Sequence, residues 1–273
     1  MTVLLMAGIN KNYKIVDLFA GIGGLSYGFK KNGFELLFAN DFDKDCCSTF
    51  LENFPKEKYF LDPIENLDEI YLNKKFGHVP KTDVLVGGVP CQPFSMSGYR
   101  NRENFKNSYD GRTYLYKEFL RLATLLQPKI LIIENVKGIV SLKGGTVFRD
   151  ILNSIERLGY ISDYKVINAA SYGAPQLRER VIIVANNIGQ KNLFPKPSHQ
   201  KENFENVKNI FIKKKHMPNH DPKMLSGLNL ERMMLLKPGQ NWKNLPKKYQ
   251  TKSQHSGAYG RIDPTKPSRT ITT

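Results

Sequence analysis

Short runs of apolar residues alternate with segments of helical periodicity along most of the chain. Apolar runs bounded by glycine, proline or charged residues are typical of buried strands, whereas apolar positions three and four apart are typical of helices with one buried face. The predicted strands cover residues 14–19, 35–39, 82–86, 129–133 and 180–185. The predicted helices cover residues 25–31, closed by Asn32-Gly33, and about 113–126.

This alternation predicts the fold class. Strands that alternate with helices favour an α/β fold with a doubly wound, mostly parallel sheet. In such a sheet the ligand site lies at the carboxyl ends of the strands, where the connecting loops gather. We therefore expect the chemistry of this chain in the loops that follow the predicted strands.

The character of the sequence changes near residue 187. Proline and lysine recur beyond it in the segments PKPSH, IKKKH, KPGQNW, LPKKY and DPTKPS, and most of the formal net charge of +16 lies there. A basic region attracts polyanions, and nucleic acid is a better candidate than an anionic membrane. We predict a first domain at residues 1–187 and a smaller basic region at residues 188–273.

Length and composition limit the classes of protein to which the chain can belong. A chain of 273 residues with 40% hydrophobic residues can bury a large core, which excludes a disordered or fibrous protein. The three cysteines include the adjacent pair Cys46 and Cys47, and no segment approaches the ~20 apolar residues of a membrane span. We expect a soluble, cytoplasmic protein without a membrane partner. His216 and His220 lack neighbouring cysteines, so we expect no metal site.

A glycine-rich turn follows the first predicted strand, in DLFAGIGGLSYGF at residues 17–29. Glycines there let the backbone approach a ligand, and the next helix begins with free N–H groups. The turn is not the dinucleotide fingerprint, because Ser26 occupies the place of its third glycine. After the second strand, Asp41 is suited to ribose hydroxyls and Phe42 to an adenine face. An adenosine-type cofactor and a generic glycine turn with a helix-capping aspartate both fit this pattern.

Three further motifs carry candidate catalytic groups. Cys91 stands in the Pro-Cys-Gln-Pro loop of GGVPCQPFSMSGYR, where the prolines stiffen the backbone around a potential nucleophile, although a lone cysteine is more often inert. Glu134 begins the ENV segment after another strand, either facing the same cleft or lying in a solvated loop. In QLRER, Arg178 and Arg180 lie on one side of an extended chain, where they can hold a phosphate or pair with surface acids.

Together these motifs resemble the cytosine-C5 DNA methyltransferases. The resemblance rests on DLFAGIGG, GGVPCQPFS, ENV and QLRER in this order and at these separations. It is supported by Asn40-Asp41-Phe42, Asp62, the DGRTYLYKEFLR stretch and GRIDPTKPSRTITT, which is similar to the ninth conserved block of the family. It covers residues 15–187 almost continuously and resumes at Tyr259.

The resemblance implies a reaction and a role for each motif. Cys91 is implied to add to carbon 6 of a flipped cytosine, which activates carbon 5 for methylation. Glu134 is implied to contact the N3 edge of the base, Arg178 to help hold the base and Arg180 to support the site. The implied cofactor is S-adenosylmethionine, with Asp41 at the ribose, Phe42 at the adenine and Asp62 at its amino group. The residues implied to line the cofactor site are Phe19, Ala20, Gly21, Gly23, Gly24, Leu25, Asp41, Phe42, Asp62, Gly88, Pro90 and Leu115.

The resemblance also implies partners. The segment at about residues 188–258 is implied to recognise double-stranded DNA, and its lysines can neutralise phosphates without reading sequence. Candidate base-reading side chains there are Asn219, Arg232, Gln240 and Asn241. The chain stops near the ninth block, whereas family members normally continue into a tenth. Either a second polypeptide supplies that block or the chain is a truncated product, and the hypothesis we favour is a split enzyme with such a partner. The usual setting of such bacterial enzymes is a restriction-modification system.

Other functions stay open at this point. A tRNA-acting member of the same family normally carries a second cysteine-bearing motif, and the basic region has no cysteine. An incomplete or non-catalytic DNA-binding subunit of a split methyltransferase is the main alternative, although Cys91, Glu134 and Arg178 are all present. An unrelated nucleotide-binding oxidoreductase is disfavoured by Ser26 and by the Pro-Cys-Gln loop.

Overall fold

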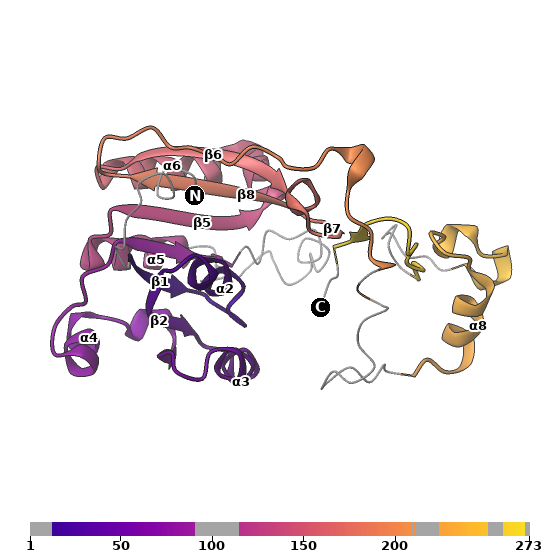
Figure 1. Cartoon of the computed structure of the whole chain (residues 1–273), viewed down its shortest axis with the longest axis horizontal. Helices are drawn as coiled ribbons and strands as arrows, with labels where there is room; N and C mark the ends of the chain where they lie inside the picture. The colour runs from indigo at the N-terminus through magenta and orange to yellow at the C-terminus, as the bar shows by residue number, and fades with distance from the viewer. Residues whose placement is uncertain (1–12, 91–114, 209, 211–223, 251–258, 271–273) are drawn as a thin grey trace. The chain divides into compact units, whose positions relative to one another are not determined.

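The computed structural model describes residues 13–90, 115–208, 210, 224–250 and 259–270. The chain divides into two compact units, coloured along the sequence in Figure 1. Unit 1 comprises Met1–Ile167 and Arg180–Pro195, and unit 2 comprises Asn168–Glu179 and Lys196–Thr273. The segment Asn168–Glu179 thus belongs to unit 2, although it lies inside the predicted first domain. The functional division at residue 187 stays a prediction.

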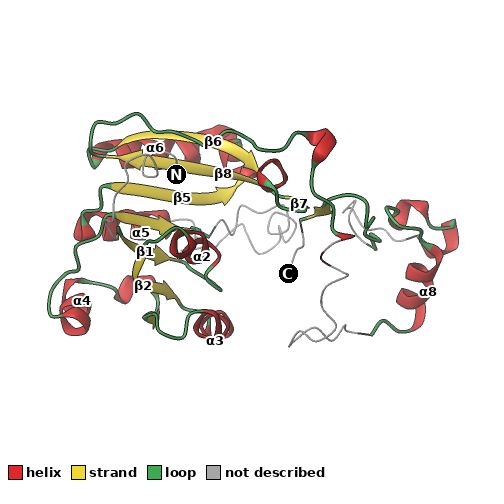
Figure 2. Ribbon diagram, in the orientation of Figure 1, coloured by secondary structure: helices red, strands yellow, loops and turns green. Residues whose placement is uncertain are grey.

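Unit 1 is built around a seven-stranded sheet with the strand order β3-β2-β1-β4-β5-β8-β6 (Figure 2). The pairs β1–β2, β2–β3, β1–β4 and β4–β5 are parallel, and β8 runs antiparallel to β5. The predicted mostly parallel α/β sheet is therefore confirmed. The strands are β1 (Lys14–Leu18), β2 (Glu35–Asp41), β3 (Tyr59–Leu61), β4 (Val84–Gly87), β5 (Ile130–Val136), β6 (Ile161–Asn168) and β8 (Glu179–Asn186).

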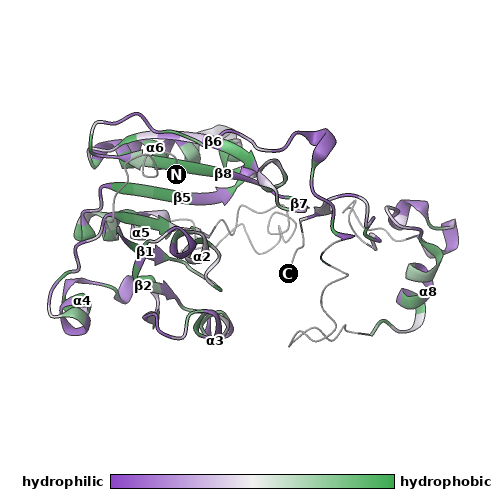
Figure 3. Ribbon diagram, viewed as in Figure 1, coloured by the Kyte–Doolittle hydropathy of each residue, from purple (hydrophilic) through white to green (hydrophobic). Residues whose placement is uncertain are grey.

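Helices cover both faces of this sheet because successive strand residues point to opposite sides. On one face, Val16 and Leu85 belong to a core cluster with Phe119 of α5, and α4 and α6 contribute to the same cluster. On the other face, Ile15 and Val84 pack in a cluster with Phe50 of α3, against which α2 also packs. Figure 3 shows the hydrophobic character of these central strands. The helices are α2 (Gly24–Lys31), α3 (Lys44–Asn53), α4 (Glu69–Phe76), α5 (Leu115–Leu126) and α6 (Thr146–Arg157).

Unit 2 combines two distant parts of the chain. Strand β7 (Gln176–Leu177) pairs in parallel with β9 (Ser268–Arg269), and α8 (Gly227–Leu235) is its described α-helix. Short 3-10 turns lie at Ala169–Tyr172, Lys201–Asn203, Trp242–Asn244 and Lys247–Tyr249. Among its described residues, Ala170, Val207, Leu236 and Leu245 are buried apolar ones.

The structure differs from the sequence prediction in two informative ways. Strand β5 continues through Val136, so Glu134 lies within the strand rather than in a solvated loop. Strand β8 runs antiparallel, so Arg180 at its start lies opposite Val136 at the end of β5. The carboxyl edge of the sheet thereby receives a residue from the beginning of a strand. In the described ranges, none of the helices has the length and apolar character needed to cross a membrane.

Candidate active site

The glycine turn after β1 requires backbone conformations that favour glycine. Gly21 and Gly23 have φ angles of 54° and 90°, and Gly23 precedes the first residue of α2. A Cβ at Gly23 would lie 2.6 Å from the Phe54 ring, whereas a Cβ at Gly21 or Gly24 would meet no heavy atom within 4 Å. Gly23 therefore permits close packing on α3, and Gly21 and Gly24 leave the backbone open to a ligand.

Asp41 ties the glycine turn to the end of β2. Its Oδ2 accepts the backbone N–H of Gly21 at 3.0 Å, and its Oδ1 accepts those of Phe42 at 2.8 Å and Asp43 at 3.2 Å. Phe42 is 68% exposed beside this carboxylate. A fixed carboxylate next to an open aromatic ring suits a ribose and an adenine, so this part of the site fits the implied cofactor.

Asp62 lies at the same edge of the sheet, one residue beyond the paired positions Asp41 and Leu61. The hydroxyl of Tyr71 donates to Asp62 Oδ2 at 2.6 Å, and Nδ2 of the buried Asn40 donates to the Asp62 carbonyl at 2.8 Å. Burial and the contact with Asp62 raise the pKa of Tyr71. The tyrosine therefore remains a hydrogen-bond donor to this carboxylate at neutral pH.

A second cluster lies where β4 and β5 end. Glu134 Oε1 is 2.9 Å from Nε of Arg180, and the two side chains are 24% and 19% exposed. A Cβ at Gly88 would lie 3.7 Å from Glu134 Oε2 and 3.8 Å from the Phe19 carbonyl oxygen. Asn135 Nδ2 donates to the Val89 carbonyl at 3.3 Å. Glu134 and Arg180 thus meet beside the loop that leads to Pro90 and Cys91.

The other residues predicted to line the site come from several elements of both units. Ala20 and Leu25 pack against the core cluster on the α3 face, and Phe19 packs against the cluster on the other face. Leu115 is the first residue of α5. Arg178 belongs to unit 2, where its backbone N–H donates to Asn168 Oδ1 at 3.1 Å. The roles assigned to all these residues stay predictions.

Some of the predicted residues lie outside the described ranges, namely Cys91, His216, Asn219 and His220. Of the candidate base readers that are described, Arg232 donates to the Tyr249 carbonyl at 2.9 Å and Gln240 Oε1 accepts the N–H of Lys237 at 2.9 Å. Asn241 caps the turn at Trp242–Asn244. Each of these three side chains therefore makes a hydrogen bond within unit 2. The described part of the chain contains no group of three or more His, Cys, Asp or Glu side chains placed to bind a metal ion.

Asp17 is a buried carboxyl at the start of the glycine-turn motif, and it is not among the residues that the sequence motifs indicated. Its side chain is fully buried, and Oδ2 accepts both the N–H of Ser26 at 3.0 Å and its hydroxyl at 2.6 Å. Oδ1 has no hydrogen-bond partner within the described ranges. Burial raises the pKa of Asp17 to about 7, against the lowering effect of the Ser26 contacts. The signal in the sequence was an aspartate inside an otherwise apolar strand.

The raised pKa of Asp17 predicts that the unfolding free energy of the protein depends on pH. Between about pH 4 and pH 7 the folded chain keeps a proton that an unfolded aspartate has released, so Asp17 stabilises the fold below about pH 4 and loses that contribution as the pH rises to about 7. Between pH 5 and pH 8 we expect the unfolding free energy of wild type to fall. The fall should be about 3 kcal/mol larger than that of the Asp17→Asn variant. Denaturant titration at both pH values measures this difference. Asp45→Asn, at an exposed position on α3, is the control, and parallel pH profiles for wild type and Asp17→Asn would contradict the assignment.

The chain was compared with known proteins. The family model for C-5 cytosine-specific DNA methylase matches residues 13–270. The type II methyltransferase M1.HphI of Haemophilus parahaemolyticus is 34% identical over 268 residues, which cover 94% of this chain and 70% of the relative. M.AgeI of Thalassovita gelatinovora is 39% identical over 187 residues, covering 68% of this chain and 42% of the relative.

Solved structures give a consistent picture. A protein encoded in an E. coli prophage and assigned as a DNA modification methyltransferase has a TM-score of 0.61 and 25% identity, covering 86% of this chain and 65% of that one. The methyltransferase EhMeth of Entamoeba histolytica, at 19% identity and a TM-score of 0.60, shares the fold over 84% of this chain and 68% of that one. Fold and family therefore agree with the sequence prediction: the chain belongs to the C-5 cytosine-specific DNA methylase family.

Proposed function

We propose that this protein transfers a methyl group from S-adenosylmethionine to carbon 5 of a cytosine in a specific sequence of double-stranded DNA, as the modification enzyme of a restriction-modification system. The observation that carries the proposal is the Glu134–Arg180 pair beside the loop that leads to Cys91. The type II methyltransferases among its relatives support the biological setting. Nothing in the comparisons supports the second polypeptide expected from the sequence, and we do not propose one.

The proposed cofactor site lies along the glycine turn and the ends of β2 and β3. Asp41 would hold the ribose hydroxyls, Phe42 would cover the adenine and Asp62 would accept its amino group. The backbone of Gly21 and Gly24 is open enough for close approach. When bound, S-adenosylmethionine supplies an electrophilic methyl group on a sulfonium. The residues named above would hold and orient it.

Cys91 is the proposed nucleophile. Its thiolate would form a bond to carbon 6 of the cytosine, and the electron pair of the 5,6 double bond would become available at carbon 5. Carbon 5 would take the methyl group as the methyl–sulfonium bond breaks, which leaves the donor as the neutral thioether S-adenosylhomocysteine. A base, for which a water molecule suffices, then removes the proton from carbon 5, and the sulfur leaves as thiolate. Carbon 6 is inaccessible in stacked DNA, so the target cytosine must first rotate out of the duplex.

Glu134 is proposed to act on the other edge of the same base. A carboxyl group at cytosine N3 stabilises the proton that this nitrogen gains as sulfur adds to carbon 6. Arg180 holds Oε1 of Glu134 at 2.9 Å and so fixes the direction of the carboxyl group. Arg178, by the same resemblance, helps hold the base. The lysines of the basic region from about residue 188 would contact DNA phosphates.

The direct test is transfer of labelled methyl groups from S-adenosylmethionine to unmethylated duplex DNA, followed by analysis of the nucleosides. We expect the label in 5-methylcytosine, with tRNA as a poor substrate. DNA binding without methyl transfer would instead favour the non-catalytic DNA-binding alternative. Label in N6-methyladenine or N4-methylcytosine would also contradict the proposal.

A further inference from the structure

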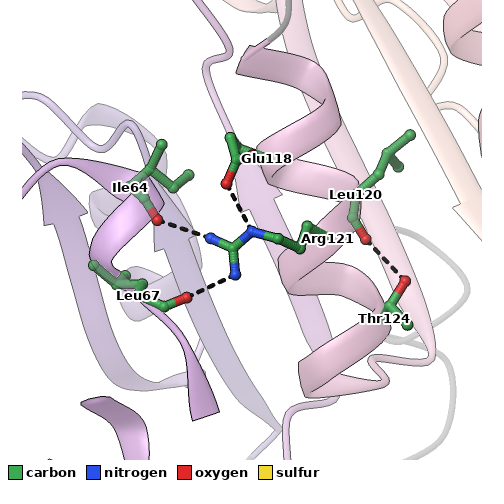
Figure 4. Close-up of polar contacts among 6 residues, drawn as sticks. All are labelled: Ile64, Leu67, Glu118, Leu120, Arg121 and Thr124. Atoms are coloured by element: carbon green, nitrogen blue, oxygen red, sulfur yellow. Dashed lines mark hydrogen bonds and ion pairs between the residues drawn. The ribbon is translucent and has the colours of Figure 1, made fainter. Parts of the chain in front are cut away.

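Arg121 connects two segments that are far apart in the sequence. It lies on α5, and Nη1 donates to the Leu67 carbonyl at 2.9 Å while Nη2 donates to the Ile64 carbonyl at 3.0 Å (Figure 4). Its Nε donates to Glu118 Oε2 at 2.7 Å, one turn earlier on the same helix. The guanidinium is thereby fixed from three directions. It joins α5 to the 3-10 turn at Ile64–Asn66.

The turn that Arg121 holds follows directly after Asp62. Ile64 and Leu67 are buried in the same core cluster as the apolar face of α5. The Ile64 carbonyl also accepts the backbone N–H of Leu67 at 3.1 Å, and the two N–H groups of Arg121 in a fixed fork bind both buried carbonyls at once. A lysine ammonium cannot reproduce that planar pair of contacts. The turn is consequently fixed in position and in direction relative to α5.

The fixed turn restrains Asp62 at both ends of a short loop. On one side, Asn40 Nδ2 donates to the Asp62 carbonyl at 2.8 Å. On the other, the chain passes from the turn into α4, whose Tyr71 returns a hydroxyl hydrogen bond to Asp62 Oδ2 at 2.6 Å. Displacement of the turn would therefore shift both the backbone that carries Asp62 and the helix that orients its carboxylate.

We propose that Arg121 is a positioning residue of the cofactor site: through the turn at Ile64–Asn66 it fixes the Asp62 carboxylate relative to Leu115 at the start of α5. This inference rests on the proposed function, in which Asp62 and Leu115 both contact S-adenosylmethionine. In this proposal Arg121 has no contact of its own with cofactor or DNA, since its hydrogen bonds go to Ile64, Leu67 and Glu118. Its contribution is preorganisation, because a carboxylate held in place loses less freedom when a ligand binds.

The proposal predicts a change in cofactor affinity with little change in the chemical step. We expect Arg121→Met, which keeps a long side chain but removes every donor, to weaken S-adenosylmethionine binding by about tenfold in calorimetry on the full chain. We expect Arg121→Lys to weaken it by a smaller factor. Both variants should keep kcat at saturating cofactor, and the KM for DNA, within about twofold. Arg149→Met, an exposed arginine on α6, is the matched control and should bind as wild type does.

A double-mutant cycle separates positioning from general stability. If Arg121 acts through Asp62, Arg121→Met should cost much less affinity in an Asp62→Asn background than in wild type. Equal losses in both backgrounds, or a lower melting temperature of Arg121→Lys with unchanged affinity, would overturn the inference. If wild type itself binds no S-adenosylmethionine, the proposed function fails. If wild type binds S-adenosylmethionine and both Arg121 variants bind it as tightly as wild type does, only the inference about Arg121 fails.

Discussion

Glu134→Gln is expected to lower the rate of methyl transfer by a factor on the order of 10²–10⁴ while leaving S-adenosylmethionine affinity within about twofold. The amide has nearly the same volume as the carboxyl group and still offers Arg180 an oxygen acceptor. It cannot exchange a proton with the N3 edge of cytosine near neutral pH, and it removes the charge that pairs with Arg180 at 2.9 Å. Single-turnover transfer to DNA at saturating cofactor measures the chemical step directly.

The matched control for this variant is Glu156→Gln. Glu156 is exposed on α6 in unit 1, so the same chemical change should leave the rate unaltered. A Glu134→Gln enzyme that keeps more than a tenth of the wild-type rate would contradict the role given to the carboxyl group. A loss of cofactor affinity as large as the loss of rate would instead indicate a displaced loop after β4.

Cys91→Ser is expected to reduce methyl transfer to background, because a neutral hydroxyl is a far weaker nucleophile than a thiolate. The covalent step can be observed separately with DNA in which 5-fluorocytosine replaces cytosine. Fluorine at carbon 5 cannot leave as a proton, so the sulfur–carbon bond persists after methylation. Wild type should form a complex with this DNA that survives denaturing electrophoresis, and Cys91→Ser should form none.

The other two cysteines support this assignment. Burial raises the pKa of the Cys46 thiol, and the nearby carboxylates of Asp43 and Asp41 raise it further. Burial also raises the pKa of the Cys47 thiol. Neither environment favours a thiolate, so Cys46→Ser is a matched control that should keep both transfer and covalent trapping. A trapped complex that depends on Cys46 would overturn the proposed nucleophile.

The strands with continuous apolar runs were predictable, and the polar or very short strands were not. Strands β1, β2, β4, β5 and β8 correspond to predicted runs of apolar residues. Nearly every residue of β1 and β4 is buried, whereas buried residues alternate with half-buried ones along β5 and most of β8. Strand β3 has three residues, and all eight residues of β6 are exposed or half-buried, so neither has a clear hydrophobic pattern. The direction of β8 could not be predicted either, because a buried strand has the same composition whether it runs parallel or antiparallel to its neighbour.

The candidate site shows a similar division. The motifs correctly indicated that Asp41 ends β2, because a βα loop follows the strand that precedes it in the sequence, whereas β5 extends two residues beyond Glu134, which was predicted to follow the strand. The supporting contacts of Tyr71 and Arg121 join residues that are separated in the sequence. A single sequence does not show which separated residues contact each other in the fold. Asp17 was missed because its meaning depends on complete burial, which only the packing of α2 on the sheet creates.

The pairing of β7 with β9 constrains recombination between related genes. Thr270 Oγ1 donates to the Leu177 carbonyl at 2.7 Å across a separation of 93 residues, and Ser268 pairs with Gln176. A single crossover at residue 195 would combine a β7 from one parent with a β9 from the other. Two crossovers, at 195 and just before β9, would keep both strands from one parent. If the segment between these crossovers reads the DNA sequence, as proposed, its exchange would change specificity without separating β7 from its partner β9.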